Sequence, residues 1–163
     1  MNTNFEKVGE FHKCFEHPIH SIPRYNIFTE EPSLIKFRQS LIDEENEEFK
    51  DGCEKHNLIE VADGLTDMLY VIYGTGHALG LDLDKIFTEV HNSNMSKLCK
   101  SEEEAIETVE WYKLNVPRYE QPSYKKSKFG NFWLIYDQKT SKILKSINYK
   151  SPNIQYILNI NSL

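Results

Sequence analysis

Apolar residues recur at helical spacing over most of the first two-thirds of the chain. The two longest patterns cover residues 34–52 and 58–80, where apolar positions return at about 100° per residue. Ser33 and Asn57 are suitable N-caps directly before these patterns, and Gly80 is a suitable end for the second. We therefore predict two long helices joined by a short polar turn.

Shorter helical patterns surround this pair. We expect helices over residues 5–16, 83–98 and 101–113, because each segment carries an apolar stripe at helical spacing. Residues 17–32 contain three prolines and show no period, so we expect a loop that leads into the first long helix.

The last part of the chain has a different character. Residues 131–137 and 142–149 are rich in β-branched and aromatic side chains and flank a polar turn, which predicts a β-hairpin. Pro152 then begins a short helix or turn. We divide the chain into a helical domain over residues 1–116 and a hairpin extension over residues 117–163, packed on the same domain.

An acidic cluster continues the apolar stripe of the first long helix. Glu44, Glu45 and Glu48 lie on this stripe, so Glu45 and Glu48 should point into a bundle, whereas Glu47 should point into water. An acidic helix face is usually solvated, and that interpretation is preferred for any one of these glutamates alone. It is weaker for the set, because partly buried like charges repel one another more strongly.

A second acidic cluster, Glu60 and Asp63, lies at the start of the next long helix. If the turn lets the helices fold back antiparallel, Glu48 and Glu60 each lie about one turn from the bend and meet at one level. Carboxylates gathered in this way need a positive charge, most simply a divalent cation. Oxygen ligands without a nearby Cys or His favour Mg²⁺ or Mn²⁺ over zinc.

Three further residues are candidates for contacts with a ligand. Asn94 and Lys97 share one helix face, where the amide can hydrogen-bond a phosphate or sugar and the ammonium can neutralise a phosphate. The alternative is an ordinary exposed helix end. His12 suits either a pocket wall that stacks on a base or a structural position in the core.

Composition limits the classes of partner. The 163 residues suffice for one domain, and the net charge of −6 argues against broad binding to nucleic acid or anionic membranes. We expect neither a membrane span nor a secretory signal, because no apolar run is long enough and the first residues lack the signal pattern. The three scattered cysteines favour a reduced, cytoplasmic setting.

The two acidic clusters also resemble a known family signature. Glu-Glu-x-x-Glu at residues 44–48, followed by Glu-x-x-Asp at residues 60–63, resembles the all-α nucleoside triphosphate pyrophosphatases. This superfamily includes MazG, dimeric dUTPases, dCTP pyrophosphatases and phosphoribosyl-ATP pyrophosphohydrolase. The segments EFHKCFEHPI, ADGLTDMLYVIYGTGHALGLD and VHNSNMSK are similar to its MazG-like and phosphoribosyl-ATP pyrophosphohydrolase-like members, and the similarity covers about residues 5–100.

The resemblance implies an all-α fold, a four- to five-helix bundle, to which the chain adds a small C-terminal β-hairpin. It also implies a homodimer or a dimer of dimers. The implied reaction is Mg²⁺-dependent cleavage between the α and β phosphates of a nucleotide, which gives a nucleoside monophosphate and pyrophosphate. Because the histidine-biosynthetic member normally lacks a tail like residues 117–163, we expect a (d)NTP or a modified nucleotide as the substrate.

The resemblance also assigns roles to individual residues. The positions that match the metal ligands are Glu45, Glu48, Glu60 and Asp63. Glu44 matches the leading acidic position and is, with Glu48, a candidate base, while Asn94 and Lys97 match a substrate-contacting segment. The alternative is a catalytically silent nucleotide-binding or scaffold protein on the same bundle.

Overall fold

The structure, a computed structural model, describes residues 2–158 and forms two compact units. The first unit contains the described residues up to Ile86 together with residues 157–158, and the second contains Phe87–Tyr156. The division therefore falls within helix α5 (Leu83–Met95), whereas the sequence predicted a boundary between residues 116 and 117. Helix α6 (Glu102–Asn115) belongs to the same unit as the strands.

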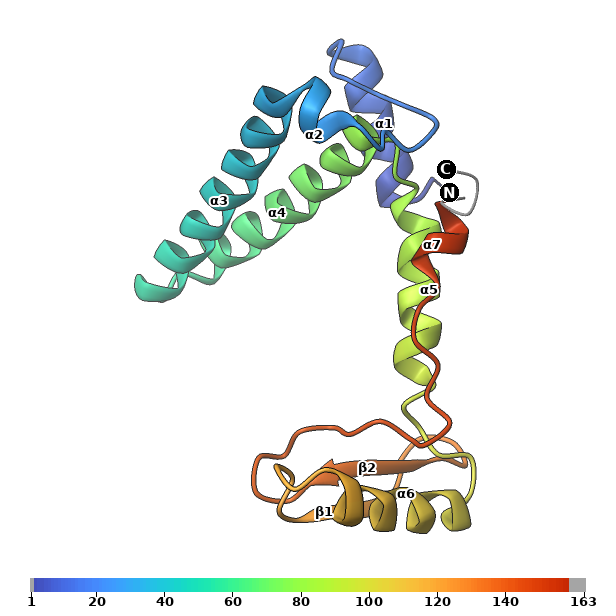
Figure 1. Ribbon diagram of the computed structural model, residues 1–163. Helices are drawn as coiled ribbons and strands as arrows, with labels where there is room; N and C mark the ends of the chain where they lie inside the picture. The colour runs from blue at the N-terminus through green and yellow to red at the C-terminus, as the bar shows by residue number, and fades with distance from the viewer. Residues whose placement is uncertain (1, 159–163) are drawn as a thin grey trace. The chain divides into compact units, whose positions relative to one another are not determined.

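The described part of the chain is mostly helical, as predicted, and it contains a small antiparallel hairpin (Figure 1). Besides α5 and α6, the elements are α1 (Asn4–Cys14), α2 (Ile27–Glu30), α3 (Pro32–Glu54), α4 (Leu58–Leu79), β1 (Pro122–Lys126), β2 (Trp133–Asp137) and α7 (Ile154–Ile157). None of these helices combines the length and apolar character that crossing a membrane requires.

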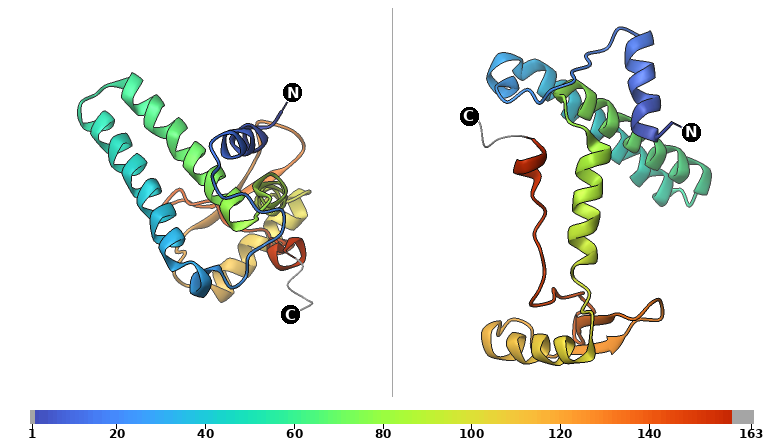
Figure 2. Two further views of the ribbon diagram at one scale, coloured as in Figure 1. Left: turned by 90° about the horizontal axis from the view of Figure 1, so that it is seen from above. Right: turned by 90° about the vertical axis from the view of Figure 1, so that its right-hand side faces the viewer.

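Helices α3 and α4 are the two long helices that the sequence predicted, and they fold back antiparallel, side by side in every view (Figures 1 and 2). Asn57 caps α4, because its side chain accepts a hydrogen bond from the backbone N–H of Ile59 at 3.1 Å. Glycines allow the close approach: a Cβ on Gly64 would lie 3.0 Å from the backbone nitrogen of Phe49, and one on Gly52 would lie 2.9 Å from that of Val61. The pair is therefore packed backbone against backbone near its bend.

The face of α4 that packs on α3 differs from the apolar face that the sequence suggests. Gly64 and Gly74 lie on the packed face, where both are buried. The leucine stripe lies outside the contact, with Leu58 80%, Leu65 46% and Leu69 50% exposed. The leucine stripe therefore does not face the interior of the first unit, because the close packing of α3 and α4 uses the glycine face instead.

Helix α1 packs on the C-terminal half of α4. Thr3 and Glu6 form a reciprocal capping box that fixes its start. The loop that follows passes close to Gly80, whose φ of +70° ends α4. A Cβ at Gly80 would overlap the carbonyl oxygen of Ile22, so both the backbone conformation and the lack of space require glycine there.

The second unit has a continuous apolar core between α6 and the hairpin. Its buried members are Cys99, Ala105, Val109, Tyr112, Ile135 and Leu144. Strand β2 matches the predicted first strand, but its partner is the preceding segment β1. The prediction that residues 142–149 form the second strand is wrong, because this segment adds only an isolated bridge between Tyr136 and Ile143.

Candidate metal and substrate site

Glu45 is the centre of the acidic site. It is half-buried on the face of α3 that meets α4. Burial raises the pKa of its carboxyl group, and the neighbouring charges of Glu48, Asp67, Glu44 and Asp63, in that order, raise it further. The structure thus brings carboxylates from both helices close enough to repel one another.

The second part of the acidic site is an open pocket of about 290 Å³ near the bend. It is lined by Glu48, Asp51, Lys55, Glu60 and Asp63. Glu48 is exposed, so the prediction that it points into the bundle is wrong for the single chain, whereas Glu47 is exposed as expected. Three of the four predicted metal ligands therefore share this pocket.

Glu60 has partners of its own at the turn. Lys55 Nζ lies 3.3 Å from one carboxylate oxygen of Glu60, and Asn57 donates a hydrogen bond of 2.9 Å to the other. These contacts occupy both oxygens. Glu60 would have to exchange the ammonium of Lys55 for a metal in order to act as a ligand.

Contrary to the prediction, Glu48 and Glu60 lie at different distances from the bend between α3 and α4. Gly52 faces the backbone of Glu60 and Val61, while Phe49 faces Gly64. Glu48 therefore lies about one helical turn further from the bend than Glu60, and the expectation that they share one level is wrong. The reason is that α3 continues beyond Gly52 to Glu54.

The donor chemistry fits a hard divalent cation, although the side chains are not gathered around one point. Among residues 2–158, no group of three or more His, Cys, Asp or Glu side chains has the geometry to hold a metal ion. The donors are carboxylate oxygens, which Mg²⁺ prefers. The pKa of Glu45 is raised first by burial and then by repulsion from neighbouring carboxylates, and a cation would remove that repulsion. Asp67, which sequence reasoning left out of the ligand set, is a further carboxylate close to Glu45.

His12 lies inside the first unit, only 3% exposed. Its Nδ1 donates to the carbonyl oxygen of Pro18 at 2.7 Å, and burial lowers the pKa of the ring, so the imidazole is neutral at pH 7 with its lone pair on Nε2. A Cβ at Gly74 would lie 2.7 Å from this Nε2 and 3.2 Å from Nη1 of Arg38.

Arg38 is also buried in the first unit, where a charged side chain is unexpected. Its side chain is 5% exposed, and neither Nε nor Nη2 has a hydrogen-bond acceptor among the residues that the structure describes. Burial lowers the pKa of its guanidinium group. Within residues 2–158, Arg38 forms no ion pair with a carboxylate, and helical spacing in the sequence alone could not indicate this.

Asn94 and Lys97 belong to the second unit, and the acidic cluster belongs to the first. Lys97 Nζ donates to Asn94 Oδ1 at 2.7 Å, which confirms that the two side chains share one face. Asn94 and Lys97 therefore form a pair in a different unit from the carboxylates.

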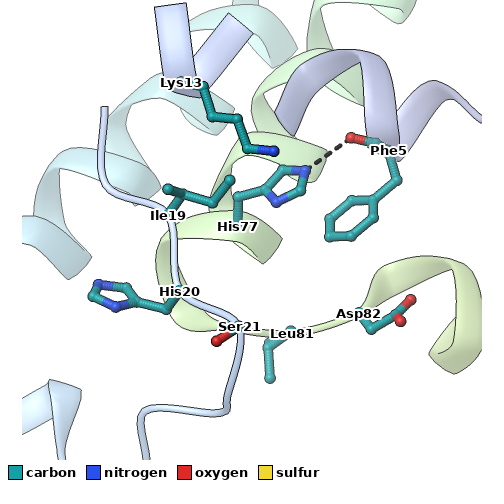
Figure 3. A pocket seen from close by; sticks show the side chains of 9 residues that line it. Phe5, Lys13, Ile19, His20, Ser21, His77, Leu81 and Asp82 are labelled. Atoms are coloured by element: carbon teal, nitrogen blue, oxygen red, sulfur yellow. Dashed lines mark hydrogen bonds between the residues drawn. The ribbon is translucent and has the colours of Figure 1, made fainter. Parts of the chain in front are cut away.

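A different pocket, of about 440 Å³, lies at the C-terminal end of α4 (Figure 3). Its wall includes His77, which donates from Nε2 to the carbonyl oxygen of Phe5 at 2.8 Å and stacks on the Phe5 ring. Asp82, the acidic residue that lines it, is paired with Lys85 at 2.7 Å. This pocket is therefore less suited to a metal than the carboxylates near the bend.

An antiparallel helical pair with carboxylates on both helices agrees with the all-α nucleoside triphosphate pyrophosphatase class, to which the family match assigns the chain. Within that class, the sequence profile of phosphoribosyl-ATP pyrophosphohydrolase matches residues 8–94, and the chain belongs to this family. The family supports a nucleotide pyrophosphohydrolase type of activity, and its members generally depend on a divalent metal.

The chain is also similar to an uncharacterized protein of Acanthamoeba polyphaga mimivirus. The two are 28% identical, and the alignment covers 96% of each chain. The similarity thus extends over both compact units, whereas the family match covers most of the first unit and the beginning of the second.

Proposed function

We propose that the protein is a Mg²⁺-dependent nucleotide pyrophosphohydrolase. It would cleave the bond between the α and β phosphates of a (d)NTP or a related nucleotide and release a nucleoside monophosphate and pyrophosphate. The observation that carries this proposal is the set of mutually repelling carboxylates around Glu45 on two facing helices, in a family of pyrophosphohydrolases.

Glu45, Glu48, Glu60 and Asp63 would hold the cation, for which Mg²⁺ or Mn²⁺ suits oxygen donors. A bound divalent metal polarises a phosphoryl oxygen and lowers the pKa of water. Glu60 would release Lys55 to join the ligand set. Glu44 or Glu48, both exposed, would accept the proton of the attacking water.

Two of the remaining predicted residues would bind the nucleotide. Lys97 would neutralise phosphate charge, and Asn94, held by its hydrogen bond to Lys97, would orient a phosphate or sugar. His12 is only 3% exposed, so we assign it the structural position in the core and leave it out of the nucleotide site.

We also propose that the protein works as a homodimer. The leucine stripe of α4, formed by Leu58, Leu65 and Leu69, leaves a continuous apolar face uncovered in the single chain. Uncovered apolar faces of this kind on a helical pair are typical of interfaces.

Substitution of single carboxylates tests the reaction. Glu48→Gln and Asp63→Asn should each reduce pyrophosphate release by about 100-fold or more while the helical circular dichroism spectrum is retained. The assay measures pyrophosphate release from a panel of (d)NTPs with and without Mg²⁺.

Glu47→Gln is the matched control, because Glu47 is exposed on the same helix and is paired with Lys50 at 2.7 Å. It should keep full activity. Full activity of Glu48→Gln would contradict the site, whereas no turnover of any nucleotide by the wild type would favour a silent nucleotide-binding or scaffold protein.

A further inference from the structure

The second unit contains a pocket of about 400 Å³ with an unusual concentration of positive charge. Four cationic side chains line it: Lys97, Arg118, Lys142 and Lys145. The described residues of its wall include no carboxylate. Four cations around one small pocket without a carboxylate in its wall make this site strongly positive.

None of these four cations is ion-paired with a carboxylate of the described residues, although five lysines elsewhere in the chain are. Each of the following lysines is ion-paired with a carboxylate: Lys50, Lys55, Lys85, Lys113 and Lys139. Like charges that share a pocket repel one another, so the arrangement is stabilised when an anion enters it.

The pocket is built by three separate segments that the core of the unit fixes. Lys97 follows α5, Arg118 follows α6, and Lys142 and Lys145 lie in the segment after β2. That last segment is anchored by the hydrogen bond from the Lys145 backbone N–H to the Tyr112 hydroxyl at 3.1 Å. The positions of the cations are thus set by the fold.

Aromatic rings hold the cationic side chains and offer a surface for stacking. The Arg118 guanidinium lies 5.0 Å and Lys142 Nζ 5.7 Å from the centre of the Tyr119 ring. Trp111, which is 47% exposed, also lines the pocket. A planar ring could therefore stack beside the cations.

We infer that this pocket binds a small ligand with two or more phosphate groups. Arginine and lysine together suit phosphate oxygens, and a volume of about 400 Å³ lies within the range of small-molecule sites. The ligand is a nucleotide whose base stacks on Trp111, or free pyrophosphate. All four cations lie outside residues 8–94, which match the family model, and three of them, Arg118, Lys142 and Lys145, lie in the C-terminal extension.

Calorimetry on the full chain tests the site. Pyrophosphate and ATP are titrated separately in EDTA, so that the carboxylates of the first unit hold no metal and repel phosphate. Both ligands should bind, and affinity should fall as salt is added. No heat of binding for either ligand at about 1 mM in low salt would overturn the inference.

The variants separate the pocket from general surface charge. Arg118→Gln with Lys142→Gln should weaken binding about tenfold or more, because charge-assisted hydrogen bonds are lost. Lys139→Gln is the matched control, since Lys139 lies in the same region but pairs with Glu120 at 2.8 Å. Equal weakening by the control variant would contradict the pocket, provided that thermal melts show all variants folded.

Two further readouts identify the ligand. If ATP binds more tightly than pyrophosphate and quenches a fluorescence signal that Trp111→Phe removes, the occupant is a nucleotide. Equal affinities without quenching indicate pyrophosphate. A single-stranded oligonucleotide that binds more tightly than ATP would overturn the small-ligand assignment in favour of nucleic acid. Because hydrolysis is not measured, loss of the proposed pyrophosphohydrolase activity would leave these outcomes unchanged.

Discussion

The two compact units differ in their interiors, although each buries both apolar and polar side chains. The second unit packs apolar residues such as Ile135 and Val109 into a continuous core. The first unit buries Arg38, His12 and His77 between its helices.

The difference suggests what each unit contributes. A core like that of the second unit stabilises its own fold through apolar burial. Buried polar groups stabilise little and are retained at functional sites more often than elsewhere. The first unit therefore combines buried polar side chains with an exposed apolar face. This combination suits a subunit of the proposed homodimer, which would gain stability from its partner.

The largest expected effect concerns the core of the second unit. Ile135→Ala should lower the free energy of unfolding of this unit by about 2–5 kcal/mol, because it leaves a cavity around a fully buried side chain. Urea unfolding is followed by tryptophan fluorescence, since both tryptophans, Trp111 and Trp133, lie in this unit. Ile106→Ala, at a position 45% exposed, should change stability by no more than about 0.5 kcal/mol. Equal losses from the two variants would refute the difference between core and surface.

The next effect concerns the apolar face of the first unit. Leu65→Asp with Leu69→Asp should raise the dimer dissociation constant tenfold or more, because burial of one leucine contributes about 1.5–3 kcal/mol. Sedimentation equilibrium measures the constant. Leu114→Asp, at a position 81% exposed in the second unit, should leave it unchanged. A wild-type chain that stays monomeric at all concentrations would contradict the homodimer.

The smallest effect concerns the repulsion around Glu45. Its pKa is raised in the folded protein, so the stability linked to its protonated form is present at low pH and is lost as pH rises through the raised value. In EDTA at pH 7, Glu45→Gln should therefore be more stable than the wild type by a few tenths of a kcal/mol, and the gain should vanish below about pH 4.

Urea unfolding followed by circular dichroism measures this gain. Addition of Mg²⁺ should stabilise the wild type but not the variant, because only the wild type keeps the complete ligand set. Glu47→Gln should show no gain in EDTA, since Glu47 is paired with Lys50. If Glu45→Gln were less stable than the wild type in EDTA, the inferred repulsion between Glu45 and its neighbouring carboxylates would be contradicted.

Most features that depend on nearby residues could be predicted from the sequence, but the prediction that Ser33 caps the first long helix is wrong, because α3 begins at Pro32 with Glu31 at the N-cap position. Asn57 and Ser101 cap the helices that follow them, because each cap involves groups only two or three residues away. The antiparallel α3–α4 pair followed from two helical patterns and a short turn.

Features that depend on distant contacts could not be predicted in the same way. The partner of β2 is the polar segment Pro122–Lys126, which lacks the β-branched pattern of a strand and pairs because it lies against the core of α6. The stagger of Glu48 and Glu60 depends on two extra residues at the end of α3. The sequence identified the acidic residues near the bend, but it did not predict their relative positions along the two helices.

Gly80 has a consequence for how this sequence can vary. Any other amino acid there would combine a left-handed backbone with overlap of the Ile22 backbone, which no rotamer can relieve. Gly130 has a similar φ of +72°, but the nearest atoms to its missing Cβ belong to the Phe132 ring, which can move. The two glycines have nearly the same φ but tolerate substitution differently. Residue 80 must be glycine, whereas another amino acid at residue 130 would strain the backbone and shift the Phe132 ring.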